Sequence, residues 1–276
     1  MRIFVTGATG YIGSEVVREL MDAGHKVIGL TRSDKGALKL KEAGAEVHQG
    51  SLDDLDSLRS GAAIADGVIH LAFKHDFSDF AGSLATDLRA IQAIGEVLEG
   101  TGKPFLTTAH AYGTASDNAT LALAKRGVRA SVVSLSTSVH GDSDKGFVPR
   151  LINIAREKGY SAYIGDGLNR WPAVHRIDAA RLFRMALETA PAGSKLDGVG
   201  DEGIPFREIA NVIGRHLDLP VISITREEAE DHFGFLGLIA ALDIPRSSAQ
   251  TQDLLNWRPE HPTLISDLEQ GDYFKK

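Results

Sequence analysis

The sequence predicts a doubly wound α/β fold, in which helices cover both faces of a parallel sheet. Short apolar runs alternate with amphipathic helical segments through residues 1–135. These runs have the length and composition of strands that are buried on both faces. A glycine-rich turn separates the first run from the first helical segment, which is where such folds bind a nucleotide.

Composition limits the function. The 276 residues suffice for one large domain with a small appendage, and a formal net charge of −7 without a basic stretch argues against a nucleic-acid or membrane-surface partner. The absence of cysteine excludes disulfides and thiolate metal sites. No signal core is present, and no stretch approaches the ~18 continuous apolar residues of a membrane span. We expect a cytoplasmic protein without a metal, either a monomer or a homodimer.

The first thirteen residues, MRIFVTGATGYIG, join a buried strand to a helix through glycines with the spacing GxxGxxG. Backbone N–H groups at the start of such a helix hold a pyrophosphate. Gly7 allows the tight turn, Gly10 lets the diphosphate approach the backbone, and Gly13 lets the helix pack closely on the sheet. The predicted pyrophosphate site comprises Gly7, Thr9, Gly10, Tyr11, Ile12 and Gly13.

The second predicted strand, residues 26–31, ends where a dinucleotide fold selects its cofactor. An acidic side chain there binds the ribose 2′-hydroxyl of NAD, whereas an arginine accepts the 2′-phosphate of NADP. Arg32 and Ser33 follow this strand and favour NADP. Asp34 leaves NAD as an alternative.

The other elements follow from apolar periodicity. Apolar residues recur at intervals of three and four through residues 76–99 and predict one long helix. Asp53 is expected to cap the helix that follows the third strand. Further helices are predicted at residues 35–43, 118–125, 147–156, 178–187 and 205–217, and further strands at 46–49, 67–73, 103–108, 129–135, 160–164 and 195–199.

Several short motifs resemble the extended and atypical branches of the short-chain dehydrogenase/reductase superfamily, the NAD-dependent epimerase/dehydratase group. The segments that carry the resemblance are TGATGYIG near the N-terminus, His70-Leu71-Ala72, SVHG at residues 138–141, WPAVHRIDAA at 171–180 and LLNWRP at 254–259. They span nearly the whole chain. The resemblance implies a Rossmann fold formed mainly by residues 1–140, to which some later elements return. Residues 141–276 would mainly form a small substrate-binding lobe.

The resemblance also implies roles for individual residues. Ser51 and Leu52 occupy the segment that lines the adenine in the family. Leu71, Ala72 and Phe73 match the strand end beside the cofactor ribose. Family enzymes interconvert carbonyl and alcohol groups with a Tyr, a Lys four residues later, and a Ser or Thr after the fifth strand. Thr108 matches this hydroxyl.

The Tyr-x-x-x-Lys pair is missing, because no tyrosine of this chain has a lysine four residues later. The hydride acceptor must still gain a proton, and Tyr112, His110 and His140 are the candidate donors. Four hypotheses therefore remain open. The chain is an NADP-dependent reductase that uses another acid, an enzyme of the atypical branch whose hydride transfer needs little acid catalysis by the protein, a non-catalytic NADP-binding sensor, or an epimerase or dehydratase.

The predicted substrate is a small, apolar carbonyl compound. His75, Thr108, Phe147 and Trp171 are the candidate residues that line its pocket, although Trp171 could instead anchor the lobe. The apolar run at residues 233–239 favours an apolar substrate over a sugar nucleotide, unless it forms a subunit contact. His75 and Asp76 form a second pair of interest after the fourth strand, although Asp76 could simply cap the long helix.

Overall fold

The computed structural model describes residues 1–76, 78–110 and 113–275. The chain folds into two units. The first contains residues 1–134, 179–196 and 250–257, and the second contains residues 135–178, 197–249 and 258–276. The first crossing between them lies close to the boundary predicted at residue 140, and two later segments return to the first unit.

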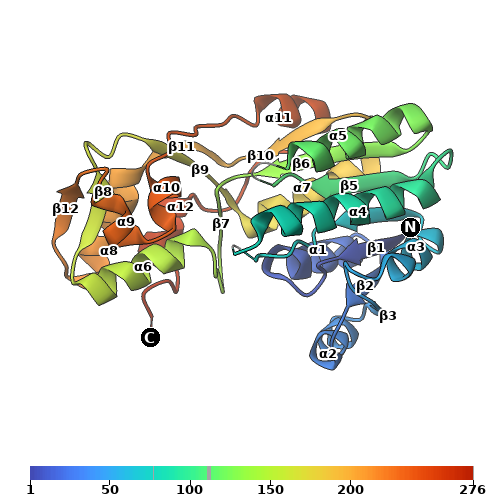
Figure 1. Ribbon diagram of the computed structural model, residues 1–276, viewed down its shortest axis with the longest axis horizontal. Helices are drawn as coiled ribbons and strands as arrows, with labels where there is room; N and C mark the ends of the chain where they lie inside the picture. Colours follow the sequence, from blue (N-terminus) through green and yellow to red (C-terminus); the bar gives the residue numbers. More distant parts are fainter. Residues whose placement is uncertain (77, 111–112, 276) are drawn as a thin grey trace. The chain divides into compact units, whose positions relative to one another are not determined.

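The first unit is built on a seven-stranded sheet with the order β10-β6-β5-β4-β1-β2-β3 (Figure 1). The pairs β1–β2, β1–β4, β2–β3, β4–β5 and β5–β6 are parallel, which confirms the predicted fold class. The order reverses between β1 and β4, so a crevice is expected at the carboxyl ends of these two strands. The strands are β1 Arg2–Thr6, β2 Lys26–Thr31, β3 Glu46–Gln49, β4 Gly67–His70, β5 Pro104–Thr108, β6 Arg129–Leu135 and β10 Lys195–Gly198.

Helices flank this sheet because its strands carry apolar side chains on both faces. Phe4 of β1 is fully buried in a core that it shares with Leu58 of α3 and Ile91 of α4. The helices and one 3-10 helix are α1 Tyr11–Asp22, α2 Asp34–Glu42, α3 Leu55–Ala63, α4 Phe80–Leu98, α5 Thr114–Ala122, η1 Leu123–Arg126, α7 Arg176–Thr189 and α11 Ala249–Leu255.

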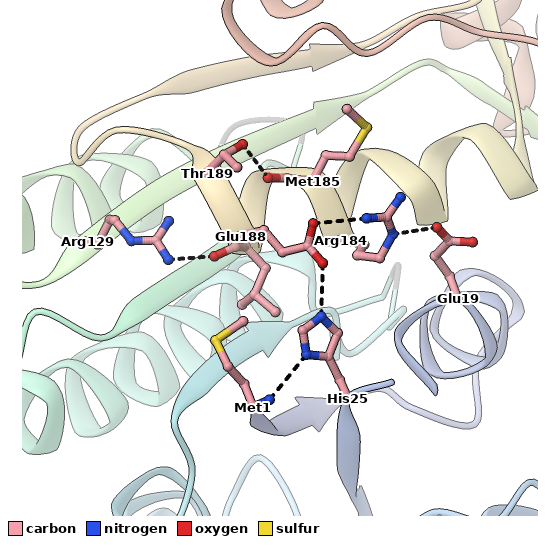
Figure 2. A network of polar contacts seen from close by, with 9 residues as sticks. Met1, Glu19, His25, Arg129, Arg184, Met185, Glu188 and Thr189 are labelled. Carbon is pink, nitrogen blue, oxygen red and sulfur yellow. Dashed lines mark hydrogen bonds and ion pairs between the residues drawn. The ribbon is translucent and has the colours of Figure 1, made fainter. Parts of the chain in front are cut away.

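A polar network joins α1, α7 and the start of β2 at the amino edge of the sheet (Figure 2). His25 lies between the Met1 ammonium group, 3.4 Å from its Nδ1, and Glu188, 2.9 Å from its Nε2. Arg184 of α7 pairs with Glu188 at 2.9 Å and with Glu19 of α1 at 2.7 Å. These contacts lie at the amino ends of the strands, whereas the glycine turn lies at their carboxyl ends.

The second unit contains a three-stranded sheet, β11-β9-β7, and a two-stranded sheet, β12-β8. Its core includes Trp171 and Phe206, whose ring centroids lie 4.9 Å apart in an edge-to-face arrangement. The strands are β7 Ser138–His140, β8 Ser161–Ile164, β9 Arg170–His175, β11 Asp201–Pro205 and β12 Val221–Ile224. The helices are α6 Phe147–Lys158, α8 Phe206–Leu217, α9 Ala229–Phe233, α10 Leu236–Ala240 and α12 Leu264–Gln270.

Several predicted element ends were wrong. Helix α4 begins at Phe80 and not near residue 76, because the Asp79 carboxylate accepts a hydrogen bond from Gly82 N at 2.9 Å and caps the helix. Asp54, one residue after the predicted cap, accepts from Ser57 N and caps α3. Strand β4 ends at His70, and α5 begins earlier than predicted. Strands β7 and β9 were not predicted. None of the helices in the described residues is both long and apolar enough to cross a membrane.

Candidate functional site

The glycine turn has the tight geometry that its spacing predicts. Gly7 adopts a φ of +70°, and a Cβ atom there would lie 2.8 Å from Ala72 N. A Cβ on Gly13 would lie 2.0 Å from Gly7 O, so the start of α1 packs directly on the turn. A Cβ on Gly10 would meet only Gly7 O, at 3.2 Å. Gly7 and Gly13 are therefore required by the fold, whereas Gly10 leaves its outer side open.

The N-terminus of α1 fits a pyrophosphate. Gly10 is its N-cap, no side chain accepts a hydrogen bond from the first turn, and the first turn carries no acidic residue. The N–H groups at the start of a helix and the positive end of the helix dipole favour a bound anion. Thr9, Tyr11 and Ile12 are half-buried around this turn. The residues present therefore suit the dinucleotide that the sequence predicts.

The end of β2 carries an available cation. Arg32 is exposed and makes no hydrogen bond or ion pair within the described part of the chain. Ser33 is the N-cap of α2, and its hydroxyl accepts a hydrogen bond from Gly36 N at 3.2 Å. Ser33 thus has a structural task in addition to the predicted contact with the cofactor. Its hydroxyl proton remains able to donate to a phosphate.

The loop after β3 meets the loop after β4. Ser51 Oγ accepts from Asp53 N at 3.3 Å, and the half-buried Leu52 packs against the core of the first unit. Asp53 forms an ion pair with Lys74 at 2.6 Å. A polar pocket of about 300 Å³ adjoins this ion pair. It is lined by Asp53, Lys74, Asp76, Asp79, Gly82, Ser83, Ala85, Thr86 and Arg89.

Leu71, Ala72 and Phe73 follow β4 and lie half-buried beside the glycine turn. The hydroxyl of Thr6, at the end of β1, accepts hydrogen bonds from the backbone N–H groups of Leu71 and Ala72, both at 3.2 Å. The structure thus brings the predicted ribose segment and the predicted pyrophosphate turn together at the carboxyl ends of β1 and β4.

A buried polar chain continues from Thr6. Its Oγ1 lies 2.8 Å from His70 Nδ1, and His70 Nε2 lies 3.2 Å from Asp87 Oδ1. Burial acts to raise the pKa of Asp87, but hydrogen bonds, of which the one from His70 has the largest effect, outweigh it, so the pKa lies below its ordinary value. Asp87 is therefore an ionised carboxylate inside the protein.

His110, a predicted proton donor, lies beside Asp87, the last residue of this hydrogen-bonded series. Its Nε2 is 4.0 Å from Asp87 Oδ1, and its ring stacks on Phe73 with centroids 4.0 Å apart. Burial lowers the pKa of His110 to about 4, although the negative charge of Asp87 acts in the opposite direction. His110 is therefore neutral at physiological pH.

The other candidates of the first unit differ in their surroundings. Thr108 is half-buried, and its hydroxyl makes only a long contact of 3.5 Å with His70 O. His75 is exposed. Asp76 accepts from the Ser78 hydroxyl at 2.5 Å and from Ser78 N at 3.0 Å, so it orders its own loop and does not cap α4. Tyr112 lies outside the described residues and remains a prediction.

Three candidates lie in the second unit. His140 exposes none of its side chain, and its Nδ1 lies 2.8 Å from Asp267 Oδ2. Trp171 is also fully buried and donates from Nε1 to Ile239 O at 3.2 Å, which supports its interpretation as a core anchor. Phe147 is half-buried, with its ring centroid 6.1 Å from that of Trp171. The burial of His140 and Trp171 leaves neither surface open to a substrate.

Sequence reasoning missed Asp87 and gave His70 no chemical role. Asp87 lies on the buried face of α4, among Ser83, Ala90 and Ile91. An acidic residue on the apolar face of a predicted helix was therefore the signal, because buried carboxylates are rare unless they are paired. The described residues contain no group of three or more His, Asp or Glu side chains arranged to hold a metal ion.

The chain is similar in sequence to several known proteins. Residues 1–96 match the NmrA-like family. An uncharacterized protein of Schizosaccharomyces pombe is 50% identical, with 99% of this chain and 100% of the relative covered. That alignment is 295 residues long and this chain has 276, so the relative carries segments that this chain lacks. The 2-alkyl-3-oxoalkanoate reductase of Stenotrophomonas maltophilia is 29% identical over 76% of this chain and 74% of its own length.

Solved structures share the fold. The dTDP-glucose 4,6-dehydratase DesIV of Streptomyces venezuelae, solved with NAD, matches with a TM-score of 0.77 and 18% identity, covering 100% of this chain and 97% of the other. The UDP-glucose 4-epimerase of Thermotoga maritima also has a TM-score of 0.77 at 18% identity, with 100% and 99% covered. The chain belongs to one family with the uncharacterized Schizosaccharomyces pombe protein, and it shares the fold of these dehydratase and epimerase structures.

Proposed function

We propose that this chain is an NADP-preferring oxidoreductase that reduces a small carbonyl compound. The observation that carries the proposal is the uncapped N-terminus of α1 behind Gly7 and Gly10, which has room and N–H groups for a diphosphate. Arg32, which has no partner among the described residues, would accept the 2′-phosphate. When bound, the nicotinamide supplies the hydride.

The residues around the crevice would orient the substrate. The Thr108 hydroxyl, held only by its 3.5 Å contact, is free to donate a hydrogen bond to a carbonyl oxygen. His110 lies on the neighbouring loop, stacked on Phe73. Leu71 and Ala72 would pack against the cofactor ribose. No Tyr-x-x-x-Lys pair is needed in this scheme, because the proton comes from another group.

The names of relatives support carbonyl reduction. The Stenotrophomonas protein is a 2-alkyl-3-oxoalkanoate reductase, and a protein of Stigmatella aurantiaca that is 25% identical over 70% of this chain is also a ketoreductase. An apolar ketone with an adjacent acid group is therefore the first compound class to test.

The proposal is tested by titrating the protein with NADPH and NADH, followed by oxidation of the bound NADPH with a panel of ketones, aldehydes and quinones. We expect NADPH to bind more tightly and at least one 3-oxo acid to be reduced. Failure to bind either nucleotide would refute the proposal.

A non-catalytic NADP sensor is the second candidate function. The missing Tyr-x-x-x-Lys pair and the match of residues 1–96 to the NmrA-like family both favour it. Tight NADPH binding without turnover on any compound of the panel would favour this function over the reductase. Release of water or inversion at a sugar carbon would instead indicate a dehydratase or an epimerase.

Replacing Arg32 with alanine is expected to weaken NADPH binding about tenfold or more, because hydrogen bonds to charged groups contribute about 1.5–3 kcal/mol. NADH affinity should remain within about twofold, since NADH has no 2′-phosphate. Fluorescence titration measures both. Lys39→Ala, which removes an exposed cation from the helix that follows Arg32, is the control. Equal losses for the two nucleotides would contradict the assignment of Arg32.

Replacing Thr108 with alanine is expected to lower kcat about tenfold to a hundredfold, since one hydrogen bond to the reacting oxygen is lost. NADPH affinity should not change. Steady-state kinetics and the NADPH titration together separate the two effects. An unchanged kcat would remove Thr108 from the site.

A further inference from the structure

Thr6 and His70 lie at the point where the strand order of the sheet reverses. They are register partners at the carboxyl ends of β1 and β4, directly before Gly7 and Leu71. Their side chains are buried, with 0% and 1% exposed. Ligands of doubly wound sheets bind in the crevice above this point. The buried hydrogen-bonded series Thr6–His70–Asp87 therefore lies directly beneath the crevice.

The contacts of Thr6 determine which atom donates and which accepts in each hydrogen bond of this series. Thr6 Oγ1 already accepts from two backbone N–H groups, so its own proton is the one that points to His70 Nδ1. His70 must then carry its proton on Nε2 and donate it to Asp87 Oδ1, 3.2 Å away. With its proton on Nε2, His70 thus holds the carboxylate in place.

Asp87 is only partly satisfied by this contact. It is 1% exposed, and its Oδ2 has no hydrogen-bond partner among the described residues. The Ser116 hydroxyl is near enough to lower the pKa of Asp87, yet it makes no hydrogen bond to Oδ2. Burying an ionised carboxylate costs several kcal/mol unless an opposite charge compensates for it. The carboxylate thus favours a positive charge at a neighbouring group.

His110 is the neighbour that can carry this charge. Its Nε2 lies 4.0 Å from Asp87 Oδ1, and 17% of its side chain is exposed, so it faces both the carboxylate and the outside. His70 and His75 also act on it, and both oppose its protonation. Burial raises the pKa of Asp117 of α5, and the negative charge of Asp87 raises it further.

We propose that Asp87 and His110 form the acid–base pair of the catalytic site, in place of the missing tyrosine and lysine, and that Thr6 and His70 position Asp87. This inference rests on the proposed oxidoreductase function. In reduction, the carbonyl carbon accepts a hydride from the nicotinamide and its oxygen takes a ring proton from protonated His110, which regains a proton from water. Asp87 stabilises the imidazolium. In the reverse direction neutral His110 removes the alcohol proton.

The low pKa of His110 determines the pH dependence. With a pKa of about 4, His110 is mostly neutral above this value, and its protonated fraction falls about tenfold per pH unit. We expect kcat/KM for carbonyl reduction to fall by this factor as the pH rises above about 5. We expect kcat/KM for alcohol oxidation to stay constant over the same pH range.

The test combines three measurements on Asp87→Asn and His110→Gln. Each variant is expected to lose about a hundredfold or more of kcat and the pH dependence of reduction, with NADPH affinity within about twofold of the natural protein. Nitrogen-edited NMR of the natural protein without cofactor should show the neutral ring of His70 in the Nε2–H tautomer. It should show no titration of His110 above pH 5.

His25→Gln is the matched control, because His25 is also paired with a carboxylate but lies at the amino edge of the sheet (Figure 2). Its kcat should remain within about twofold. Unchanged turnover in His110→Gln, or a neutral His70 ring in the Nδ1–H tautomer, would overturn this inference and leave the proposed function standing. Loss of NADPH binding or of all turnover by the natural protein would instead overturn the proposed function, and this inference with it.

Discussion

Gly13→Ala is expected to lower the free energy of unfolding by about 3 kcal/mol or more and to abolish NADPH binding. The added Cβ atom would lie 2.0 Å from Gly7 O and 2.8 Å from Gly7 C, both backbone atoms. No side chain can move aside to relieve this contact, so the start of α1 must shift away from β1. Urea unfolding followed by circular dichroism measures the loss.

Gly10→Ala separates binding from folding. Its Cβ atom meets only Gly7 O at 3.2 Å, so we expect the free energy of unfolding to change by no more than about 1 kcal/mol. The methyl group would occupy the open side of the turn, and NADPH affinity should fall about tenfold or more. A Gly10→Ala protein that binds NADPH normally would show that the cofactor does not approach this turn. A stable Gly13→Ala protein would contradict the packing argument.

Trp171→Ala is expected to destabilise the second unit by about 3–5 kcal/mol, since a fully buried indole is removed. Trp171→Phe keeps an aromatic ring against Phe206 and removes the N–H group that donates to Ile239 O. We expect it to cost about 1 kcal/mol for the hydrogen bond, with a further cost for the smaller ring. Trp257 is the only other tryptophan. Its fluorescence reports on the first unit alone, whereas the circular dichroism signal reports on both units.

These variants also test the two interpretations of Trp171. A core anchor predicts that stability falls while KM for the substrate of the folded protein stays the same. If Trp171→Ala kept its stability but raised KM, the indole would instead stack on the substrate. The complete burial of the side chain leads us to expect the first result.

The strands of the first unit could be predicted closely because each is a short apolar run between polar turns. β2, β3 and β6 begin and end at the residues that the sequence predicts. β9 was missed because Pro172 interrupts it, and a proline seldom lies within a central strand. Here Pro172 falls where the ladder with β11 shifts register and just before pairing with β7 starts at Ala173. Its missing N–H group therefore costs no ladder bond.

The proposed cofactor half of the site could be predicted because a diphosphate needs glycines at fixed spacing, which a sequence displays directly. The acid–base half depends on residues far apart in the chain. Thr6, His70 and Asp87 come from β1, β4 and α4, and only the parallel register of β1 and β4 brings the first two together. No local pattern encodes that contact. His110 could be predicted because it follows the strand that carries the family hydroxyl.

The way the chain crosses between its two units has a consequence for synthesis on the ribosome. The first 134 residues supply six parallel strands, but the first unit also needs residues 179–196 and 250–257. Until β10 has been made, the edge of β6 offers unpaired backbone groups to other strands. β6 therefore remains an unpaired edge strand while most of the second unit is being translated. During this interval a chaperone would protect the chain from aggregation.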